Sequence, residues 1–283
     1  MVAGKGGVGK TTVTAVIARA ASSAGRRVLV VELDGKPALA DLIPDIEVTT
    51  ISPPEALDEY LRDHGFARVA KRLHRTGVID MVGTAAPGID DIVVLGKIKQ
   101  LERSGAYDLI VVDGPAAGHA VTFLTSAAGL AASVRSGPVR AQADDVLDLL
   151  HDHDRAQVVL VALAETTPVN EAIETAFALE DKVGVRLGPV VVNNVDLGAP
   201  LPDLDESESA VAATDDDTAA MLLDAAAFRR GRRAMESEEI RRLGDELPLP
   251  QVTLPARAVA GLSSTDIDAL AASLGPPTGT ATP

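Results

Sequence analysis

The sequence predicts an α/β fold, namely a doubly wound and mostly parallel β-sheet flanked by helices, with helical elaborations. Nearly continuous, valine-rich runs occur at 28–33, 108–114, 158–163 and 189–195, and a weaker run covers 251–255. Short runs of this kind are typical of parallel strands that are buried on both faces. Because segments with helical periodicity alternate with these runs, the connections between strands are expected to be helices that cover the sheet.

The helices are predicted from the spacing of apolar residues and from the residues at their ends. The first covers 11–25, where Val13, Val16 and Ala20 lie on one face and Gly25 is suited to the left-handed residue that ends a helix. The other predicted helices cover 90–104, 120–133, 140–151, 168–183 and about 217–245.

We expect a single domain over residues 1–275, because the sequence contains no internal repeat and no second nucleotide-binding loop. A short helical elaboration is expected at about 120–155. The acidic stretch 203–217 is predicted to be a loop, and the tail 276–283 is predicted to be disordered.

Charge and composition exclude several classes of function. The 283 residues include 41 acidic and 26 basic ones, a net charge of −15, so we expect no binding to nucleic acid or anionic lipid. The absence of cysteine excludes disulfides, thiolate zinc sites and iron–sulfur clusters. The sequence shows no signal peptide and no apolar run of about 20 residues, so we expect a cytoplasmic protein without membrane insertion.

The most informative motif is GKGGVGKT at residues 4–11, which fits the phosphate-binding pattern G-x-x-x-x-G-K-[ST]. Its glycines let backbone N–H groups turn toward phosphate oxygens, and the helix that follows adds the positive end of its dipole. In this pattern Lys10 binds the β- and γ-phosphates and the Thr11 hydroxyl binds Mg²⁺. A glycine-rich turn that matches by chance is the alternative. The predicted nucleotide contacts of the loop are Gly4, Gly6, Gly7, Val8, Gly9, Lys10, Thr11 and Thr12.

Two aspartates follow predicted strands and are expected near the carboxyl edge of the sheet, where open α/β folds bind ligands. Asp34 comes directly after the strand at 28–33, although a helix cap or a loop residue is the alternative. Asp113 lies at the end of the strand at 108–114 and is placed to hold Mg²⁺ through a water molecule. The predicted ligands are therefore ATP and Mg²⁺, with the metal near Thr11, Asp34 and Asp113.

The longer stretch GKGGVGKTT at residues 4–12 resembles the deviant Walker A motif of the ParA/MinD/ArsA family of P-loop ATPases. The segments PGIDD at 87–91, GPAAGHA at 114–120 and LAETTPVNEAIE at 163–174 are similar to segments of its ArsA/Get-type, anion-transporting ATPase-like branch. The first three residues of GPAAGHA differ from the family's run, and we interpret His119 as a structural or switch residue. The resemblance implies a P-loop NTPase fold and ATP hydrolysis.

The resemblance also implies roles for individual residues. Lys5 would reach across a dimer interface to the nucleotide of the other subunit, whereas a solvated loop lysine is the alternative. Asp34 matches an aspartate that orients the attacking water, although Pro37 and Ala38 replace the usual histidine and asparagine of that motif. The residues predicted to be catalytic are Lys5, Lys10 and Asp34.

The run VVVNNVD at 190–196 allows two interpretations of base recognition. By resemblance to ArsA-like ATPases, Asn193 would contact adenine. The spacing of Asn193, Asn194 and Asp196 also fits the guanine-reading pattern Asn-Lys-x-Asp, in which the aspartate accepts hydrogen bonds from guanine. Because the lysine of that pattern is missing and the phosphate loop is of the ATPase type, the sequence favours ATP.

Departures from the family narrow the expected partners. Without cysteine we expect no arsenite site and no zinc-bridged dimer, and four methionines offer little for a groove that holds a client's apolar helix. The chain most resembles compact, cysteine-free ArsA-like ATPases of high-GC bacteria. This similarity suggests a homodimer, or a heterodimer with a paralogous ArsA-like ATPase, that acts on an unknown client protein.

The sequence thus predicts a Mg²⁺-dependent, ATP-hydrolysing dimeric switch that couples hydrolysis to an unidentified protein partner or transport process. Two alternatives stay open: a non-catalytic nucleotide-binding subunit of a paired ATPase complex, and a ParA/MinD-type positioning ATPase. The stretch 264–283 contains no Lys or Arg, unlike the basic helix of MinD-like proteins. Only three residues precede the loop, so its strand is expected to be a stub whose natural start lies upstream of Met1.

Overall fold

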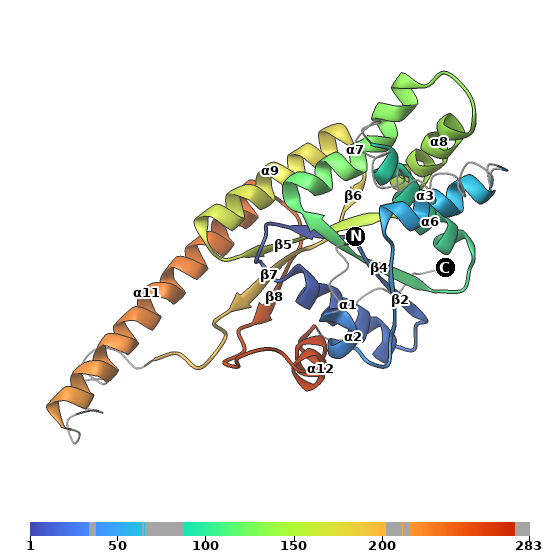
Figure 1. Ribbon diagram of the computed structural model, residues 1–283. Helices are drawn as coiled ribbons and strands as arrows, with labels where there is room; N and C mark the ends of the chain where they lie inside the picture. Colours follow the sequence, from blue (N-terminus) through green and yellow to red (C-terminus); the bar gives the residue numbers. More distant parts are fainter. Residues whose placement is uncertain (34–37, 64, 66–87, 202–210, 212–214, 275–283) are drawn as a thin grey trace, which may run out of the picture.

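The chain is organised around an eight-stranded parallel sheet (Figure 1). The computed structural model describes residues 1–33, 38–63, 65, 88–201, 211 and 215–274. The strands are β1 (Val2–Gly4), β2 (Val28–Glu32), β3 (Glu47–Thr50), β4 (Leu109–Ala116), β5 (Gln157–Leu163), β6 (Arg186–Leu187), β7 (Val190–Val195) and β8 (Gln251–Pro255). Their order is β3-β2-β4-β1-β5-β7-β8, with β6 paired to β5, and all of these pairings are parallel.

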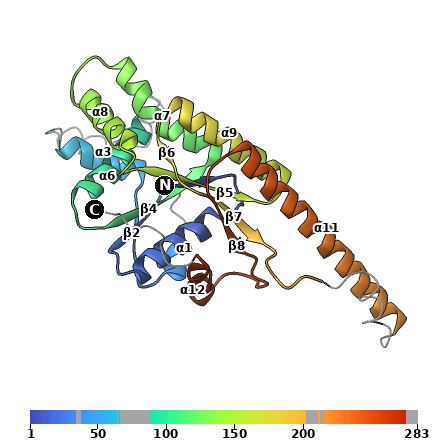
Figure 2. The same cartoon turned by 180° about the vertical axis from the view of Figure 1, so that it is seen from behind.

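Helices cover both faces of the sheet, as Figures 1 and 2 show from opposite sides. Helices α1, α2 and α12 pack together on one face, whereas α6, α7, α8 and α9 lie on the other. This arrangement confirms the predicted doubly wound α/β fold. The helices are α1 (Lys10–Ser23), α2 (Ala38–Leu42), α3 (Pro53–Asp63), α6 (Ile89–Arg103), α7 (Ala117–Ser133), α8 (Pro138–His151), α9 (Thr166–Lys182), α11 (Asp216–Glu246) and α12 (Ser264–Ser273).

Strand β2 shows why the central strands are apolar along their whole length. All five of its residues are buried. Leu29 and Val31 pack into the core beneath α6 and α7, whereas Val28 and Val30 pack into the core beneath α1 and α12. Since successive side chains of a strand point to opposite faces, a sheet covered on both faces needs apolar residues at every position.

The sequence predicted five strands and six helices that the structure contains, within a few residues at their ends. It did not predict β3, an edge strand of sequence EVTT that has no buried residue, or β6, which has only two residues. It also did not predict α2, α3 and α12. Helix α12 is short, and its start is fixed by a capping box in which Ser263 and Asp266 bond each other's backbone N–H groups.

The acidic loop predicted over 203–217 lies mostly outside the described residues, and so does the tail at 276–283. The last two residues of that predicted loop are helical, because the Asp215 side chain accepts a hydrogen bond from the Thr218 N–H at 3.0 Å and caps α11. The elaboration expected at about 120–155 corresponds to most of α7 and α8. Within the described part of the chain, no helix has both the length and the apolar character needed to cross a membrane.

Candidate functional site

The glycine-rich loop joins β1 to α1 at the carboxyl edge of the sheet, and β1 lies between β4 and β5 at the centre. Gly9 directly precedes α1 with a φ of 92°, a left-handed conformation that glycine adopts without strain. A Cβ atom here would lie 2.2 Å from the Asn193 Nδ2 atom, so the position requires glycine. Helix α1 then presents its free N–H groups at the end of the loop, an arrangement suited to binding phosphate.

The other predicted contacts of the loop lie where its pattern places them. Gly4 ends β1 and Thr12 lies in the first turn of α1. Val8 is buried, whereas Gly6 and Gly7 are exposed. The loop is therefore anchored at its ends and through one apolar side chain, while its middle faces solvent.

Asp113 lies next to the start of α1. Its Oδ2 atom accepts a hydrogen bond from the Thr11 hydroxyl at 2.8 Å, and its Oδ1 atom accepts one from the Thr14 hydroxyl at 3.2 Å. In the sheet, Asp113 is in register with Val2 of β1 and Glu32 of β2. The structure thus brings together Thr11 and Asp113, two of the three predicted magnesium residues.

The donor set at this point fits Mg²⁺, a hard cation that prefers oxygen ligands. Thr11 supplies a hydroxyl and Asp113 a carboxylate. Among the described residues, no group of three His, Cys, Asp or Glu side chains could hold a metal ion. Mg²⁺ at this site would therefore depend on phosphate and water oxygens, as in other nucleotide sites where the protein supplies one or two ligands. The third predicted residue, Asp34, lies outside the described residues.

The two loop lysines make different contacts. The Lys10 Nζ atom donates a hydrogen bond to the Lys5 carbonyl at 3.2 Å, so its side chain curls over the loop. The Lys5 Nζ atom lies 2.8 Å from the Glu171 carboxylate on α9, and both side chains are more than a third exposed. In the single chain, Lys5 is thus held by an ion pair with its own α9, and the resemblance gave no indication of this partner.

Asn193 on β7 contacts the loop, since its Nδ2 atom donates a hydrogen bond to the Val8 carbonyl at 2.9 Å. Asp196 is engaged elsewhere: Arg229 of α11 binds it at 2.6 Å, and its Oδ1 atom accepts a hydrogen bond from the Gly198 N–H at 3.0 Å. The hydrogen bonds from Arg229 hold the pKa of Asp196 well below its usual range. Because both carboxylate oxygens are already bonded, the arrangement argues against the guanine-reading alternative.

Two residues that the sequence interpretation missed contact residues of the site, and a third, Glu32, lies beside Asp113 in the sheet. Thr14 bonds Asp113 and Glu171 bonds Lys5, as described above. Glu32 is buried at the end of β2, where its carboxylate accepts hydrogen bonds from the Leu39 N–H at 3.3 Å and the Thr50 hydroxyl at 3.4 Å. Two features of the sequence could have identified these residues. Thr14 follows Thr11 by three residues and so faces the sheet from α1, and Glu32 is an acidic residue within the apolar run 28–33.

His119 lies on the first turn of α7 and is exposed. Asp91 on α6 has its pKa raised by burial and by Asp90, and His119 opposes this rise. The segment 88–91 leads into α6 as its pattern predicted. The structural or switch role of His119 stays a prediction.

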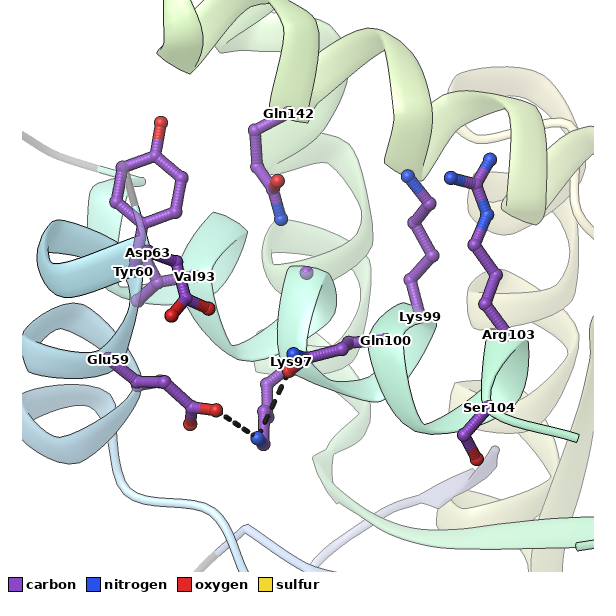
Figure 3. A pocket seen from close by; sticks show the side chains of 12 residues that line it. Glu59, Tyr60, Asp63, Val93, Lys97, Lys99, Gln100, Arg103, Ser104 and Gln142 are labelled. Atoms are coloured by element: carbon purple, nitrogen blue, oxygen red, sulfur yellow. Dashed lines mark hydrogen bonds and ion pairs between the residues drawn. The ribbon is translucent and has the colours of Figure 1, made fainter. Parts of the chain in front are cut away.

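A pocket of about 470 Å³ lies between α3, α6 and α8, and it contains none of the predicted nucleotide contacts (Figure 3). Its charged side chains are largely paired. Lys97 bonds Glu59 and also donates to Gln100 at 3.0 Å, while the buried Lys99 pairs with Asp145. We therefore place the candidate site at the phosphate-binding loop and not in this pocket.

A parallel sheet that carries a GxxxxGKT loop after its central strand, with an aspartate of the neighbouring strand beside the loop threonine, defines a P-loop nucleoside triphosphatase. Comparisons with known proteins agree. The family profile described as anion-transporting ATPase matches residues 1–140. The ATPase BagA of Mycobacterium tuberculosis is 31% identical over 295 aligned residues, which cover 90% of this chain and 86% of that protein.

The arsenical pump-driving ATPases of Escherichia coli and Acidiphilium multivorum are 28% and 27% identical. Each alignment covers 69% of this chain but only 34% of the other protein. The chain therefore belongs to the ArsA family of anion-transporting ATPases, and it is an ATPase. The predicted family, fold class and enzyme class are confirmed.

The close approach of Gly9 and Asn193 predicts the effect of a single methyl group. Gly9→Ala places a Cβ 2.2 Å from the Asn193 Nδ2 atom, so the Asn193 side chain or the loop must shift, and it forces alanine into a left-handed conformation that costs about 1–2 kcal/mol. We expect this variant to bind a fluorescent ATP analogue at least about tenfold more weakly. The matched control is Gly129→Ala on α7, where a Cβ meets no atom within 4 Å and binding should be unchanged. Equal affinity of Gly9→Ala and the native chain would contradict the described loop geometry.

Proposed function

We propose that this ATPase is a Mg²⁺-dependent dimeric switch, a single-domain protein over residues 1–275 that couples ATP hydrolysis to a protein partner or transport process. The observation that supports it most is the 2.8 Å hydrogen bond between Thr11 and Asp113 at the N-terminus of α1. This bond joins the loop that would bind the phosphates to the carboxylate that would help to hold Mg²⁺.

The nucleotide would lie along the carboxyl edge of the sheet. Backbone N–H groups of the loop and Lys10 would bind the phosphates, and Thr11 and Asp113 would hold Mg²⁺. When bound, Mg²⁺ neutralises the charge that develops on the phosphates as the bond to the γ-phosphate breaks. Asn193, which already bonds the loop, would contact the adenine side, and Asp34 would orient the attacking water.

The proposed dimer rests on Lys5. Its ammonium group is partly exposed and held by one ion pair with Glu171. Exposed ion pairs contribute little free energy, about 0–1 kcal/mol, so Lys5 can exchange Glu171 for the phosphates of a second subunit at little cost. The second subunit would be another copy of the chain or a paralogous ArsA-like ATPase.

The cargo is not proposed to be arsenite. The names of the pump-driving relatives refer to arsenicals, but metalloid sites favour soft thiolate ligands and this chain contains no cysteine. Its net charge of −15 likewise disfavours nucleic acid as the partner. We propose a cytoplasmic ATPase whose client is a protein.

The role of Asp113 predicts a change in metal dependence. Asp113→Asn keeps the side-chain shape but removes the charge, so half-maximal ATP turnover should require about 10–100-fold more Mg²⁺. The matched control is Asp108→Asn, directly before β4, where the carboxylate bonds Arg27 instead. The control should keep the native Mg²⁺ dependence. An Asp113→Asn variant with unchanged Mg²⁺ dependence would disprove the proposed metal role.

The role of Lys5 can be separated from its ion pair within the chain. Lys5→Ala should lower kcat at least about tenfold, with little change in ATP affinity, because a charge that stabilises the transition state is lost. Glu171→Ala removes the same ion pair but keeps Lys5, so it should retain turnover. If both variants lose kcat equally, Lys5 acts through Glu171 and not on the nucleotide of a second subunit.

A further inference from the structure

Helix α11 is long, and few of its residues are buried by the part of the chain that the structure describes. It spans 31 residues, of which only Glu236, Glu239 and Leu243 are buried. Figures 1 and 2 show its N-terminal half projecting away from the sheet. We call this half, residues 216–231, the arm. Within the part of the chain that the structure describes, none of the arm's side chains is buried.

The arm is attached to the body of the protein at a defined point. Arg229 bonds Asp196 at 2.6 Å, and Arg233 donates to the Gly198 carbonyl at 3.0 Å. Further along, the Thr166 hydroxyl of α9 donates to Glu239 at 2.8 Å. The helix is therefore fixed from Arg229 onward, while the preceding residues extend about 1.5 Å each beyond the body. Helices in water draw most of their stability from packing of an apolar face, so an apolar face that the described residues leave uncovered indicates a packing partner.

The arm and its attachment expose a row of large apolar side chains. Met221 is 73% exposed, Phe228 72% and Met235 42%. These three residues are spaced by seven, so they lie in one seam along the helix, as in helices that pair side by side. Exposed large apolar side chains aligned on one helix face are typical of a surface that associates with another protein.

We propose that this seam packs against the same seam of a second copy of the chain, with the two helices antiparallel and the two-fold axis at Phe228. The sequence around Phe228 is self-complementary. Met221 and Met235 lie seven residues before and after it, so each would meet the other in the second copy. The small residues Ala225 and Gly231, three before and three after, would let the two helices approach closely.

The charges favour the antiparallel orientation. Asp224 lies four residues before Phe228 and Arg232 four residues after it, and both are exposed. In an antiparallel pair, Asp224 of each copy faces Arg232 of the other. In a parallel pair, each would face its own counterpart and repel it. The inference rests on the dimer of the proposed function but not on ATP turnover, because it concerns a surface distinct from the nucleotide loop.

Disulfide crosslinking tests the arrangement directly, since the native chain has no cysteine. Two Cα atoms must come within about 6 Å to form the bond, whereas residues 221 and 235 of one helix are about 21 Å apart. Phe228→Cys should therefore crosslink to itself under mild oxidation. Met221→Cys should crosslink when mixed with Met235→Cys, but not alone. Val259→Cys, at a residue 49% exposed and off the seam, is the control and should stay monomeric on a denaturing gel.

Charge reversal gives a second readout that keeps the apolar seam intact. Asp224→Arg alone and Arg232→Asp alone should each associate several-fold more weakly in sedimentation velocity. An equimolar mixture of the two should regain association, because both cross-pairs are then of opposite charge. Thermal unfolding of each variant checks that the chain is folded, since Arg232 also bonds Glu236 at 2.9 Å.

Two results would overturn the inference. One is self-crosslinking of Met221→Cys, which requires a parallel pair. The other is the absence of crosslinks in both Phe228→Cys and the Met221→Cys with Met235→Cys mixture, which would assign the seam to a different partner. If ATP turnover of these variants is normal in the latter case, the ATPase switch stands and only the arm pairing fails. If the crosslinks form but no turnover occurs, the pairing stands and the proposed function fails.

Discussion

Parallel pairing of the strands is the constraint on which the site depends. Parallel strands end at the same edge of a sheet, so β1, β4 and β7 deliver the loop, Asp113 and Asn193 to one place although they are far apart in the sequence. The register places Val2 opposite Asp113, and the Thr11 hydroxyl then reaches the carboxylate at 2.8 Å. Because β1 has only three residues, its position depends on the neighbouring β4 and β5, and a shift of either strand would separate the threonine from the aspartate.

Much of the fold and part of the site could be predicted from the sequence. Strands buried on both faces leave apolar runs, and a glycine-rich loop leaves a spacing pattern, so β2, β4, β5, β7 and the loop were identified. The ion pair of Lys5 with Glu171 could not be predicted, because it depends on how α9 lies over the loop and neither residue carries a local pattern. The contact of Asn193 with Val8 could not be predicted either, because 185 residues separate the two and only the fold brings them together.

Two exposed features of the chain are suited to contact with a second protein. Lys5 is held by an exposed ion pair that costs little to exchange, and α11 carries an apolar seam that the rest of the described chain does not cover. The root of the arm is linked to the nucleotide edge through Asp196, three residues after Asn193. In the proposed switch, a nucleotide that shifts β7 would also shift the attachment of the arm.

The central hypothesis, that Thr11, Asp113 and the nucleotide phosphates together hold the divalent cation, is tested most directly by electron paramagnetic resonance with Mn²⁺ in place of Mg²⁺. The chain would be titrated with Mn²⁺ in the presence and absence of a non-hydrolysable ATP analogue. We expect one Mn²⁺ per chain to bind with the analogue more tightly than Mn²⁺ binds the free analogue, with a hyperfine coupling to phosphorus, and to bind more weakly when Asp113 is replaced by Asn. Equally tight binding without nucleotide, or bound Mn²⁺ that shows no coupling to phosphorus, would contradict it.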